Sequence, residues 1–417
     1  MEYFEISGGK KLFGSVELVG AKNSVLPLVA ASILTSDEII LRNCPFISDV
    51  DAMVDLCRSI GRNCVREGRS IITYGSVRDP YVSTEYATKM RASIFLLAPI
   101  LASCKRVVSA YPGGCKIGKR KIDLHLKALK KMGANIDEGD SYLVCHAAKL
   151  KGAKMRLKYP SVGATETIIM AAVTAEGVTE LENAAIEPEI GDLVSMLRLM
   201  GANIEETGER KFKIVGVEKL SGAVFEPCPD RIVGGTLMAA CAMLGGKLEI
   251  RNFPYELSKD YARLLRSDTL LITEKYGIVT MDGLGMPHGL GKIETSPYPS
   301  FPTDLQAQFM ALASVCDGRT IIEENVFENR FLTAYELMKM GAKINVDKNC
   351  AVIDGVQNLF GADVVASDLR GGAALTMAGA FASGKTKVYG VELIDRGYER
   401  LDETFASLGI PIVRKSC

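Results

Sequence analysis

Residues 150–183 read LKGAKMRLKYPSVGATETIIMAAVTAEGVTELEN, which is the pattern of a short strand, a polar loop, an apolar helix, a glycine and a second strand. The same order recurs at residues 220–252, 290–325 and 359–390. A helix that is apolar nearly all round, such as residues 168–174, has no face for water and is expected to be buried on every side. The pattern therefore predicts sheets packed outside a helical interior.

Two glycine landmarks show that this unit of about 70 residues is written six times along the chain. The first landmark is a Leu-Gly or Leu-x-Gly step at the start of a strand. The second is a Met-Gly, Leu-Gly or Ile-Gly step at the end of an amphipathic helix. The first set is Gly14, Gly152, Gly222, Gly291 and Gly361, and the second is Gly61, Gly133, Gly201, Gly341 and Gly409. One copy is degraded, around residues 263–272. Because a single unit of this period cannot bury its own apolar face, we expect an α/β fold of βαβαβ-type repeats, three to a domain.

The quoted copy also predicts where its elements end. Its inner helix is expected over residues 165–176, with Gly177 as the stop signal at the C-terminus. A second, amphipathic helix is expected over residues 192–200, and a strand over residues 202–205.

Composition favours a two-domain enzyme-sized chain without a nucleic-acid or membrane partner. The 417 residues carry 50 basic and 50 acidic side chains, so no net field attracts nucleic acid or an acidic membrane. Apolar runs such as residues 93–102 are too short to span a bilayer, and residues 1–5 lack the pattern of a signal peptide. With 11 scattered cysteines and three histidines without metal-ligand spacing, we expect free thiols, a cytoplasmic location and no zinc.

The junctions between polar loop and inner helix carry unusual residues. They read Ala21-Lys22-Asn23, Lys89-Met90-Arg91, Pro160-Ser161-Val162-Gly163, Pro229-Asp230-Arg231, Pro302-Thr303-Asp304 and Ser367-Asp368-Leu369-Arg370. The aspartates can be simple helix caps. The cations are harder to dismiss, because positive charge at a helix N-terminus opposes the helix dipole and needs a compensating anion. Since helix N-termini bind anions, the junctions predict an anionic, phosphorylated ligand.

The segment Tyr111-Pro-Gly-Gly-Cys-Lys-Ile-Gly-Lys-Arg120 is the sharpest local motif. It nearly matches a phosphate-binding P-loop, but Arg120 stands where a Ser or Thr should bind magnesium. A second interpretation is a glycine-hinged loop that carries Cys115, whose basic neighbours favour the reactive thiolate. An exposed loop with an incidental thiol is the plain alternative.

A series of short motifs runs in order along nearly the whole chain. In the first half they are Gly20-Ala-Lys-Asn23, Met90-Arg-Ala-Ser93, Pro112-Gly-Gly-Cys115 with Arg120, Asp123-Leu-His125, Ser161-Val-Gly-Ala-Thr165 and Glu187-Pro-Glu-Ile190. In the second half they are Phe301-Pro-Thr-Asp304 with Gln308, Val326-Phe-Glu-Asn-Arg330, Ser367-Asp-Leu-Arg370 and Ile394-Asp-Arg-Gly-Tyr-Glu399. In these motifs the chain resembles the UDP-N-acetylglucosamine enolpyruvyl transferase family.

This resemblance implies a two-domain inside-out α/β barrel of six repeats, with a cleft between the domains. One domain would comprise residues 1–20 and 230–417, and the other residues 21–229 with the Cys115 lid loop. The implied reaction moves the enolpyruvyl group of phosphoenolpyruvate to the 3-hydroxyl of UDP-N-acetylglucosamine and releases phosphate. It is the first committed step of peptidoglycan synthesis.

The resemblance also implies roles for particular residues. Cys115 would be the acid or the covalent phospholactoyl carrier, and Asp304 the base near the sugar hydroxyl or a group that only orients it. Lys22 and Arg396 complete the catalytic set. Phosphoenolpyruvate would be held by Lys22, Asn23, Arg120, Arg330, Arg370 and Arg396. The sugar nucleotide would be lined by Asn23, Arg91, Arg120, Lys121, Ile122, Asp123, Leu124, Tyr159, Pro160, Ser161, Val162, Asp304 and Val326. No metal or cofactor is implied.

Several positions depart from the family pattern. Lys121 replaces a proline, Ile186 a basic residue, and Tyr159 a common lysine, so the lid and uridine binding are expected to differ, and residues 254–272 diverge most. Two other functions stay open. A shikimate 3-phosphate enolpyruvyl transferase shares the repeat but carries a different junction and no cysteine lid. A UDP-sugar sensor without catalysis is disfavoured by the retained Cys115 and Asp304.

Overall fold

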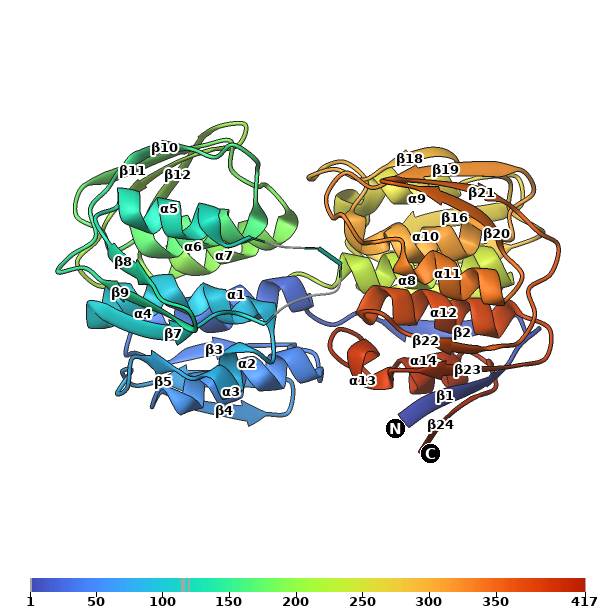
Figure 1. Ribbon diagram of the computed structural model, residues 1–417, viewed down its shortest axis with the longest axis horizontal. Helices are drawn as coiled ribbons and strands as arrows, with labels where there is room; N and C mark the ends of the chain where they lie inside the picture. Colours follow the sequence, from blue (N-terminus) through green and yellow to red (C-terminus); the bar gives the residue numbers. More distant parts are fainter. Residues whose placement is uncertain (1, 114–116, 119–120, 417) are drawn as a thin grey trace. The chain divides into compact units, whose positions relative to one another are not determined.

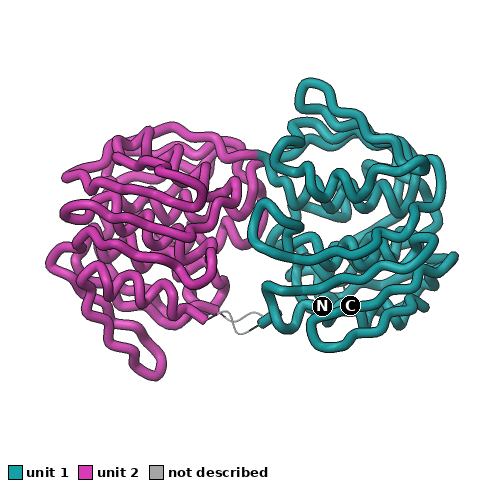
Figure 2. Tube along the Cα trace, turned by 90° about the horizontal axis from the view of Figure 1, so that it is seen from above, with its two compact units in different colours: residues 1–19, 116–119, 229–417 teal, residues 20–115, 120–228 magenta. Residues whose placement is uncertain are grey.

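The computed structural model describes residues 2–113, 117–118 and 121–416, which form two compact units. Unit 1 comprises the described parts of residues 1–19, 116–119 and 229–417, and unit 2 those of residues 20–115 and 120–228 (Figure 2). Each unit contains three four-stranded sheets, as three repeats to a domain predict.

Unit 2 holds sheets in the orders β14-β3-β5-β4, β6-β7-β9-β8 and β10-β11-β13-β12. The strands are β3 (Ile39–Leu41), β4 (Asn63–Glu67), β5 (Ser70–Tyr74), β6 (Tyr81–Val82), β7 (Arg106–Ala110), β8 (Asn135–Glu138), β9 (Tyr142–His146), β10 (Lys154–Arg156), β11 (Val178–Glu182), β12 (Asn203–Gly208), β13 (Lys211–Val215) and β14 (Ala223–Phe225). The helices are α1 (Lys22–Ala31), η1 (Ser32–Leu34), α2 (Ser48–Ser59), α3 (Thr84–Ala87), η2 (Arg91–Leu96), α4 (Leu97–Cys104), α5 (Asp123–Lys131), α6 (Val162–Ala172) and α7 (Pro188–Leu199).

Unit 1 holds sheets in the orders β2-β15-β17-β16, β18-β19-β21-β20 and β22-β23-β1-β24. The strands are β1 (Glu2–Ser7), β2 (Leu12–Glu17), β15 (Gly246–Arg251), β16 (Leu270–Lys275), β17 (Ile278–Gly283), β18 (Gly291–Glu294), β19 (Arg319–Glu323), β20 (Lys343–Asp347), β21 (Cys350–Asp354), β22 (Asp363–Val365), β23 (Lys385–Tyr389) and β24 (Ile412–Ser416). The helices are α8 (Arg231–Leu244), η3 (Tyr255–Ser258), α9 (Lys259–Leu265), η4 (Thr303–Leu305), α10 (Gln306–Ala313), α11 (Leu332–Lys339), α12 (Leu369–Phe381), α13 (Val391–Ile394) and α14 (Leu401–Ser407).

All six sheets have the same pairing pattern, which confirms the repeat. The first two strands in each order above are parallel, and both later pairs are antiparallel. The strand-opening glycines lie in or within two residues of the parallel edge strands β2, β10, β14, β18 and β22. The βαβαβ prediction missed one strand of each sheet. In five copies the sheet closes with a hairpin such as β12–β13, and in the last copy the N-terminal strand β1 pairs with the C-terminal strand β24.

The inner helices are buried, as their apolar sequences predicted. Every residue from Ala164 to Ala172 in α6 and from Arg370 to Ala380 in α12 is buried. Strands of the same repeats alternate between buried and more exposed residues, as sheets with one solvated face do. Figure 1 shows the sheets outside and helices inside each unit, and in unit 1 α8, α10 and α12 pack on one another.

Glycines end the second helix of five repeats, but one inner helix ends earlier than expected. Gly133 and Gly201 follow α5 and α7 with φ of 93° and 100°, the left-handed conformation typical of a residue that ends a helix. By contrast, α6 stops at Ala172 instead of residue 176, and Gly177 belongs to the turn before β11. The β-branched Val173 and Thr174, which favour helix less than Ala does, follow its last turn.

The divergent segment still occupies a helix position of the repeat. Residues 254–272 form the short η3 and α9 and the start of β16, so this copy, the fourth along the chain, has a shortened helix but a complete sheet. Within the described residues no helix combines the length and hydropathy needed to cross a membrane.

Candidate functional site

The six loop-to-helix junctions all begin helices, and three lie in each unit. In unit 2 they start α1, η2 and α6, and in unit 1 they start α8, η4 and α12. The predicted site residues divide in the same way. Unit 1 carries Asp304, Val326, Arg330, Arg370 and Arg396, whereas unit 2 carries Lys22, Asn23, Arg91, Lys121, Ile122, Asp123, Leu124, Tyr159, Pro160, Ser161 and Val162. Cys115 and Arg120 lie outside the described residues.

The three junction aspartates of unit 1 do different things. Asp230 caps α8, accepting hydrogen bonds from the backbone N–H groups of Ile232 and Val233, both at 2.9 Å. Asp368 caps α12 in the same way, at 2.9 and 3.2 Å. The capping interpretation is therefore confirmed for Asp230 and Asp368. The side chain of Asp304 instead forms ion pairs.

Asp304 joins two buried arginines. Its Oδ1 lies 3.1 Å from Nη2 of Arg330, and its Oδ2 lies 3.0 Å from Nη2 of Arg370. The arginine side chains are 3% and 2% exposed, against 27% for the carboxylate. Arg330 comes from the turn before α11 and Arg370 from the first turn of α12. One carboxylate thus holds two guanidinium groups from distant parts of the chain at a single place.

Arg370 keeps unused hydrogen-bonding capacity. Its Nε and Nη1 are buried, and neither has a hydrogen-bond partner among the described residues. Burial disfavours its charge, but Tyr398, Asp304 and Asp230 favour it more strongly and raise the pKa of Arg370 above its ordinary value. The Tyr398 ring lies beneath the guanidinium, 5.3 Å from Cζ to ring centroid. A buried cation with two open donors can bind an anionic oxygen.

A buried polar network that sequence reasoning missed supports this cluster. Nε2 of Gln308 lies 3.0 Å from the Asp304 carbonyl oxygen and 3.0 and 3.1 Å from the hydroxyl oxygens of Tyr398 and Thr236, and these three acceptors share its two hydrogens. Those two hydroxyls lie 2.8 Å apart. Because α8, α10 and the turn after α13 all contribute, the network fixes both the backbone of Asp304 and the ring under Arg370. The sequence signals were the polar Gln308 in the apolar pattern of α10 and the presence of Gln308 and Tyr398 in the family-like motifs.

In unit 2 the central pair is Lys22 with Asp49. Nζ of Lys22 lies 2.8 Å from Oδ2 of Asp49, and both side chains are under 10% exposed. Lys22 starts α1, which has no side-chain cap, and Asp49 lies in the first turn of α2. The neighbouring Asn23 is exposed.

Of the predicted nucleotide residues, 121–124 and 159–162 gather at the starts of α5 and α6, which pack together, whereas Asn23 lies in α1, Arg91 starts η2, and Asp304 and Val326 are in unit 1. Ser161 caps α6, accepting from the Ala164 N–H at 3.4 Å, and Asp123 pairs with Lys127 at 2.7 Å on the surface of α5. Nδ1 of His125 and the Thr167 hydroxyl, 2.8 Å apart, link the two helices. Within residues 121–124 and 159–162, Lys121 and Tyr159 are exposed and the others are half-buried.

The structure corrects one step of the sequence analysis. Junction cations were expected to need an external anion, but Lys22 and Arg370 already pair with Asp49 and Asp304. Protein carboxylates therefore compensate these charges in part. The observation that now supports an anionic ligand is that Nε and Nη1 of Arg370 have no hydrogen-bond partner among the described residues.

Unit 2 also contains an acidic residue that sequence reasoning did not single out. Glu166, in the middle of α6, is 1% exposed, and neither carboxylate oxygen has a hydrogen-bond partner among the described residues. Burial, reinforced by the charges of Glu189 and Glu187, raises the pKa of Glu166 well above its ordinary value. A carboxyl group in such surroundings is expected to hold its proton.

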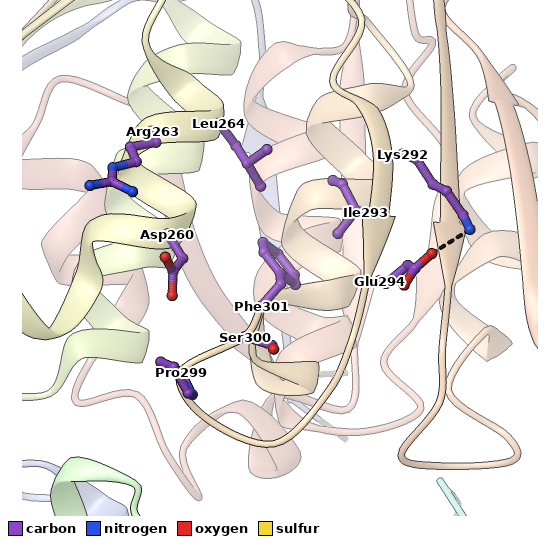
Figure 3. A pocket seen from close by; sticks show the side chains of 9 residues that line it. All are labelled: Asp260, Arg263, Leu264, Lys292, Ile293, Glu294, Pro299, Ser300 and Phe301. Atoms are coloured by element: carbon purple, nitrogen blue, oxygen red, sulfur yellow. Dashed lines mark ion pairs between the residues drawn. The ribbon is translucent and has the colours of Figure 1, made fainter.

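A separate cavity of about 460 Å³ lies in unit 1 between α9 and β18 (Figure 3). Leu264, Ile293 and Phe301 form its apolar part, and Lys292 at its edge pairs with Glu294. None of the predicted site residues lines it. The cavity therefore lies between the divergent segment and the repeat that follows it, apart from the predicted site residues.

Three-repeat units with buried inner helices and charged helix starts define the enolpyruvyl transferase fold. The solved enolpyruvyl transferase NikO from Streptomyces tendae superposes with a TM-score of 0.90 at 24% identity, covering 100% of this chain and 99% of that one. EPSP synthase from Acinetobacter baumannii gives a TM-score of 0.76 at 18% identity over the full length of both chains. At these identities the likeness shows the fold alone.

The chain belongs to the EPSP synthase (3-phosphoshikimate 1-carboxyvinyltransferase) family, whose model matches residues 6–405. It is 44% identical over 412 residues to UDP-N-acetylglucosamine 1-carboxyvinyltransferase 1 of Caldanaerobacter subterraneus subsp. tengcongensis, covering 99% of each chain. It is 42% identical to UDP-N-acetylglucosamine 1-carboxyvinyltransferase of Orientia tsutsugamushi (strain Boryong), covering 98% of each.

Proposed function

We propose that this protein is a transferase that moves the enolpyruvyl group of phosphoenolpyruvate to the 3-hydroxyl of UDP-N-acetylglucosamine and releases phosphate. The reaction would be the first committed step of peptidoglycan and cell-wall synthesis, in the cytoplasm. Full-length identity to relatives of that name supports the acceptor. The observation that carries the chemistry is Asp304 between Arg330 and Arg370, because one ionised carboxylate lies beside donors for an anionic substrate.

The reaction needs a proton at C3 of phosphoenolpyruvate while C2 gains cationic character. Cys115 would supply that proton, or its sulfur would add to C2 as the covalent phospholactoyl carrier. Asp304 would accept the proton of the sugar 3-hydroxyl as its oxygen bonds to C2. Loss of a proton from C3 and of phosphate from C2 then restores the double bond in the product.

The cations would hold the two anionic groups of phosphoenolpyruvate. The open donors of Arg370 suit a phosphate or carboxylate oxygen, and Arg330, Arg396, Arg120 and Lys22 would complete this set. Fixed donors cost little reorganisation as charge develops in the transition state. The starts of α5 and α6 would bind the sugar nucleotide, in part through backbone groups.

Phosphate release tests this function. The purified protein is mixed with phosphoenolpyruvate and either UDP-N-acetylglucosamine or shikimate 3-phosphate. We expect release with the sugar nucleotide and none above background with shikimate 3-phosphate. Absence of release with UDP-N-acetylglucosamine would exclude the proposed acceptor, and binding of the sugar nucleotide without turnover would favour a sensor.

A second experiment tests Cys115 with an epoxide-bearing phosphonate that mimics phosphoenolpyruvate. The other thiols provide internal controls, because burial raises the pKa of Cys44, Cys241 and Cys316 to about 12 and keeps them protonated. We expect peptide mass mapping to place the label on Cys115. A label on any other cysteine would contradict its role.

A further inference from the structure

Glu324 is a buried acidic residue, 3% exposed, directly after β19. Its two carboxylate oxygens serve different segments. Oε2 accepts a hydrogen bond from the Thr303 hydroxyl at 2.9 Å, and Oε1 accepts from the backbone N–H groups of Val326 and Phe327 at 2.8 and 3.0 Å. The side chain therefore ties the η4 turn to the loop that follows β19.

These contacts close a ring around Asp304. Thr303 precedes Asp304 in η4, so Glu324 holds the backbone next to it. On the other side, the Phe327 ring lies 5.4 Å from Cζ of Arg330, which pairs with Asp304 at 3.1 Å. Glu324 thus reaches Asp304 by two routes, through the preceding residue and through its arginine partner.

From this geometry we propose that Glu324 is a positioning residue for Asp304, an inference that rests on the proposed function. Thr303 is the link through which it acts. The carboxylate has one oxygen for each segment, so it sets the separation between η4 and the 326–327 turn. A displacement of about 1 Å at a reacting group can cost about 100-fold in rate. Asp304 is 27% exposed, so contacts such as these contribute to its placement.

The adjacent Glu323 provides a matched control. It is the last residue of β19 and pairs with Lys292 at 3.1 Å, away from the ring around Asp304. Glu323→Gln removes the same charge one position earlier in the chain. It is expected to leave kcat unchanged, because exposed ion pairs contribute little.

The test compares Glu324→Gln with Thr303→Val, Thr303→Ser and Glu323→Gln in the phosphate-release assay. Glutamine keeps one acceptor oxygen for the two N–H groups but presents an NH2 group to the Thr303 hydroxyl. We expect kcat to fall about 10- to 100-fold in Glu324→Gln and Thr303→Val, with KM for both substrates changing less than threefold. Thr303→Ser keeps the hydroxyl and should retain most of the activity.

A double-mutant cycle separates positioning from general support of the fold. In an Asp304→Asn background, Glu324→Gln should cause less than a twofold further loss of product, measured by mass spectrometry, because the group it positions is already removed. Equal losses in both backgrounds, or wild-type kcat in Glu324→Gln, would overturn the proposal. Failure of the proposed function would look different, since the unmodified protein would then release no phosphate with UDP-N-acetylglucosamine.

Discussion

Asp304 in unit 1 and Glu166 in unit 2 both lie in helical segments that start from a repeat junction, yet their surroundings are opposite. Asp304 is partly exposed and lies between two arginines at 3.0 and 3.1 Å. Glu166 is buried and coupled to Glu187 and Glu189, which keeps its pKa well above the ordinary value. The helical segment that follows a junction can therefore carry a charged, positioned carboxylate in one repeat and a neutral one in another, and the partners from other segments decide which.

The largest effect is expected where the charged carboxylate is neutralised. Asp304→Asn keeps the shape of the side chain but removes the base and the charge that both arginines share. We predict that kcat falls about 10²- to 10⁴-fold in the phosphate-release assay. Asp354→Asn is the control, because Asp354 forms an exposed pair with Arg319 at 2.7 Å. A kcat of Asp304→Asn within threefold of wild type would rule out a catalytic base there.

A smaller loss is expected from Arg370→Lys. Arginine pairs with Asp304 through one nitrogen and presents two others in a fixed plane. Lysine keeps the charge but has a single nitrogen, so it cannot do both. We predict about a 10- to 100-fold lower kcat/KM for phosphoenolpyruvate, with KM for the sugar nucleotide changed less. Arg319→Lys on the surface should match wild type. An unchanged kcat/KM would mean that the open nitrogens of Arg370 do not bind substrate.

Glu166→Gln tests the neutral carboxyl through pH. Because the folded pKa is raised, the native state binds the proton more tightly than the unfolded chain, and stability is lost as pH rises from the ordinary value of 4.5 toward the raised one. Each unit of pKa shift costs about 1.4 kcal/mol once the group ionises. Urea unfolding should show that wild type loses stability between pH 5 and pH 8 relative to Glu166→Gln. Glu205→Gln, at an exposed position, should show the same pH dependence of stability as wild type. If Glu166→Gln also showed the wild-type pH dependence, Glu166 would be ionised in the folded protein and the prediction would be wrong.

The smallest effects concern the helix caps of the two units. Asp368 accepts two N–H groups at 2.9 and 3.2 Å, whereas Ser161 accepts one at 3.4 Å. Asp368→Ala should reduce the free energy of unfolding by about 1–2 kcal/mol and Ser161→Ala by about 0.5 kcal/mol. Denaturant midpoints measure both, and a reversed order would show that cap geometry does not set their contributions.

Much of the fold could be predicted because the same sequence pattern occurs six times along the chain. The glycine landmarks placed the parallel edge strands and the ends of the second helices, and the junction residues marked each helix start. The fourth strand of each sheet was missed, since neither a hairpin partner nor the N-terminal strand β1 carries a landmark of its own. The early end of α6 at Ala172 was missed because a glycine such as Gly177 is a stronger helix stop signal than the Val173 and Thr174 that follow the helix.

The site could be predicted in its members but not in its pairings. Asp304, Arg330 and Arg370 stand far apart in the sequence, so no local pattern says that one carboxylate joins them. Glu324 and Glu166 carried no motif, and Gln308 belonged to a motif that gave it no role, so only their burial and their partners show what they do. Sequence patterns report what one segment does, whereas these contacts arise between segments.

One competition experiment tests the proposed function most directly. The protein is given phosphoenolpyruvate with equal concentrations of UDP-N-acetylglucosamine and shikimate 3-phosphate, and the products are identified by mass spectrometry. We predict a single new product, the enolpyruvyl ether of the sugar nucleotide, which Asp304→Asn forms far more slowly. Enolpyruvyl transfer to shikimate 3-phosphate, or no product from either acceptor, would contradict the proposed function.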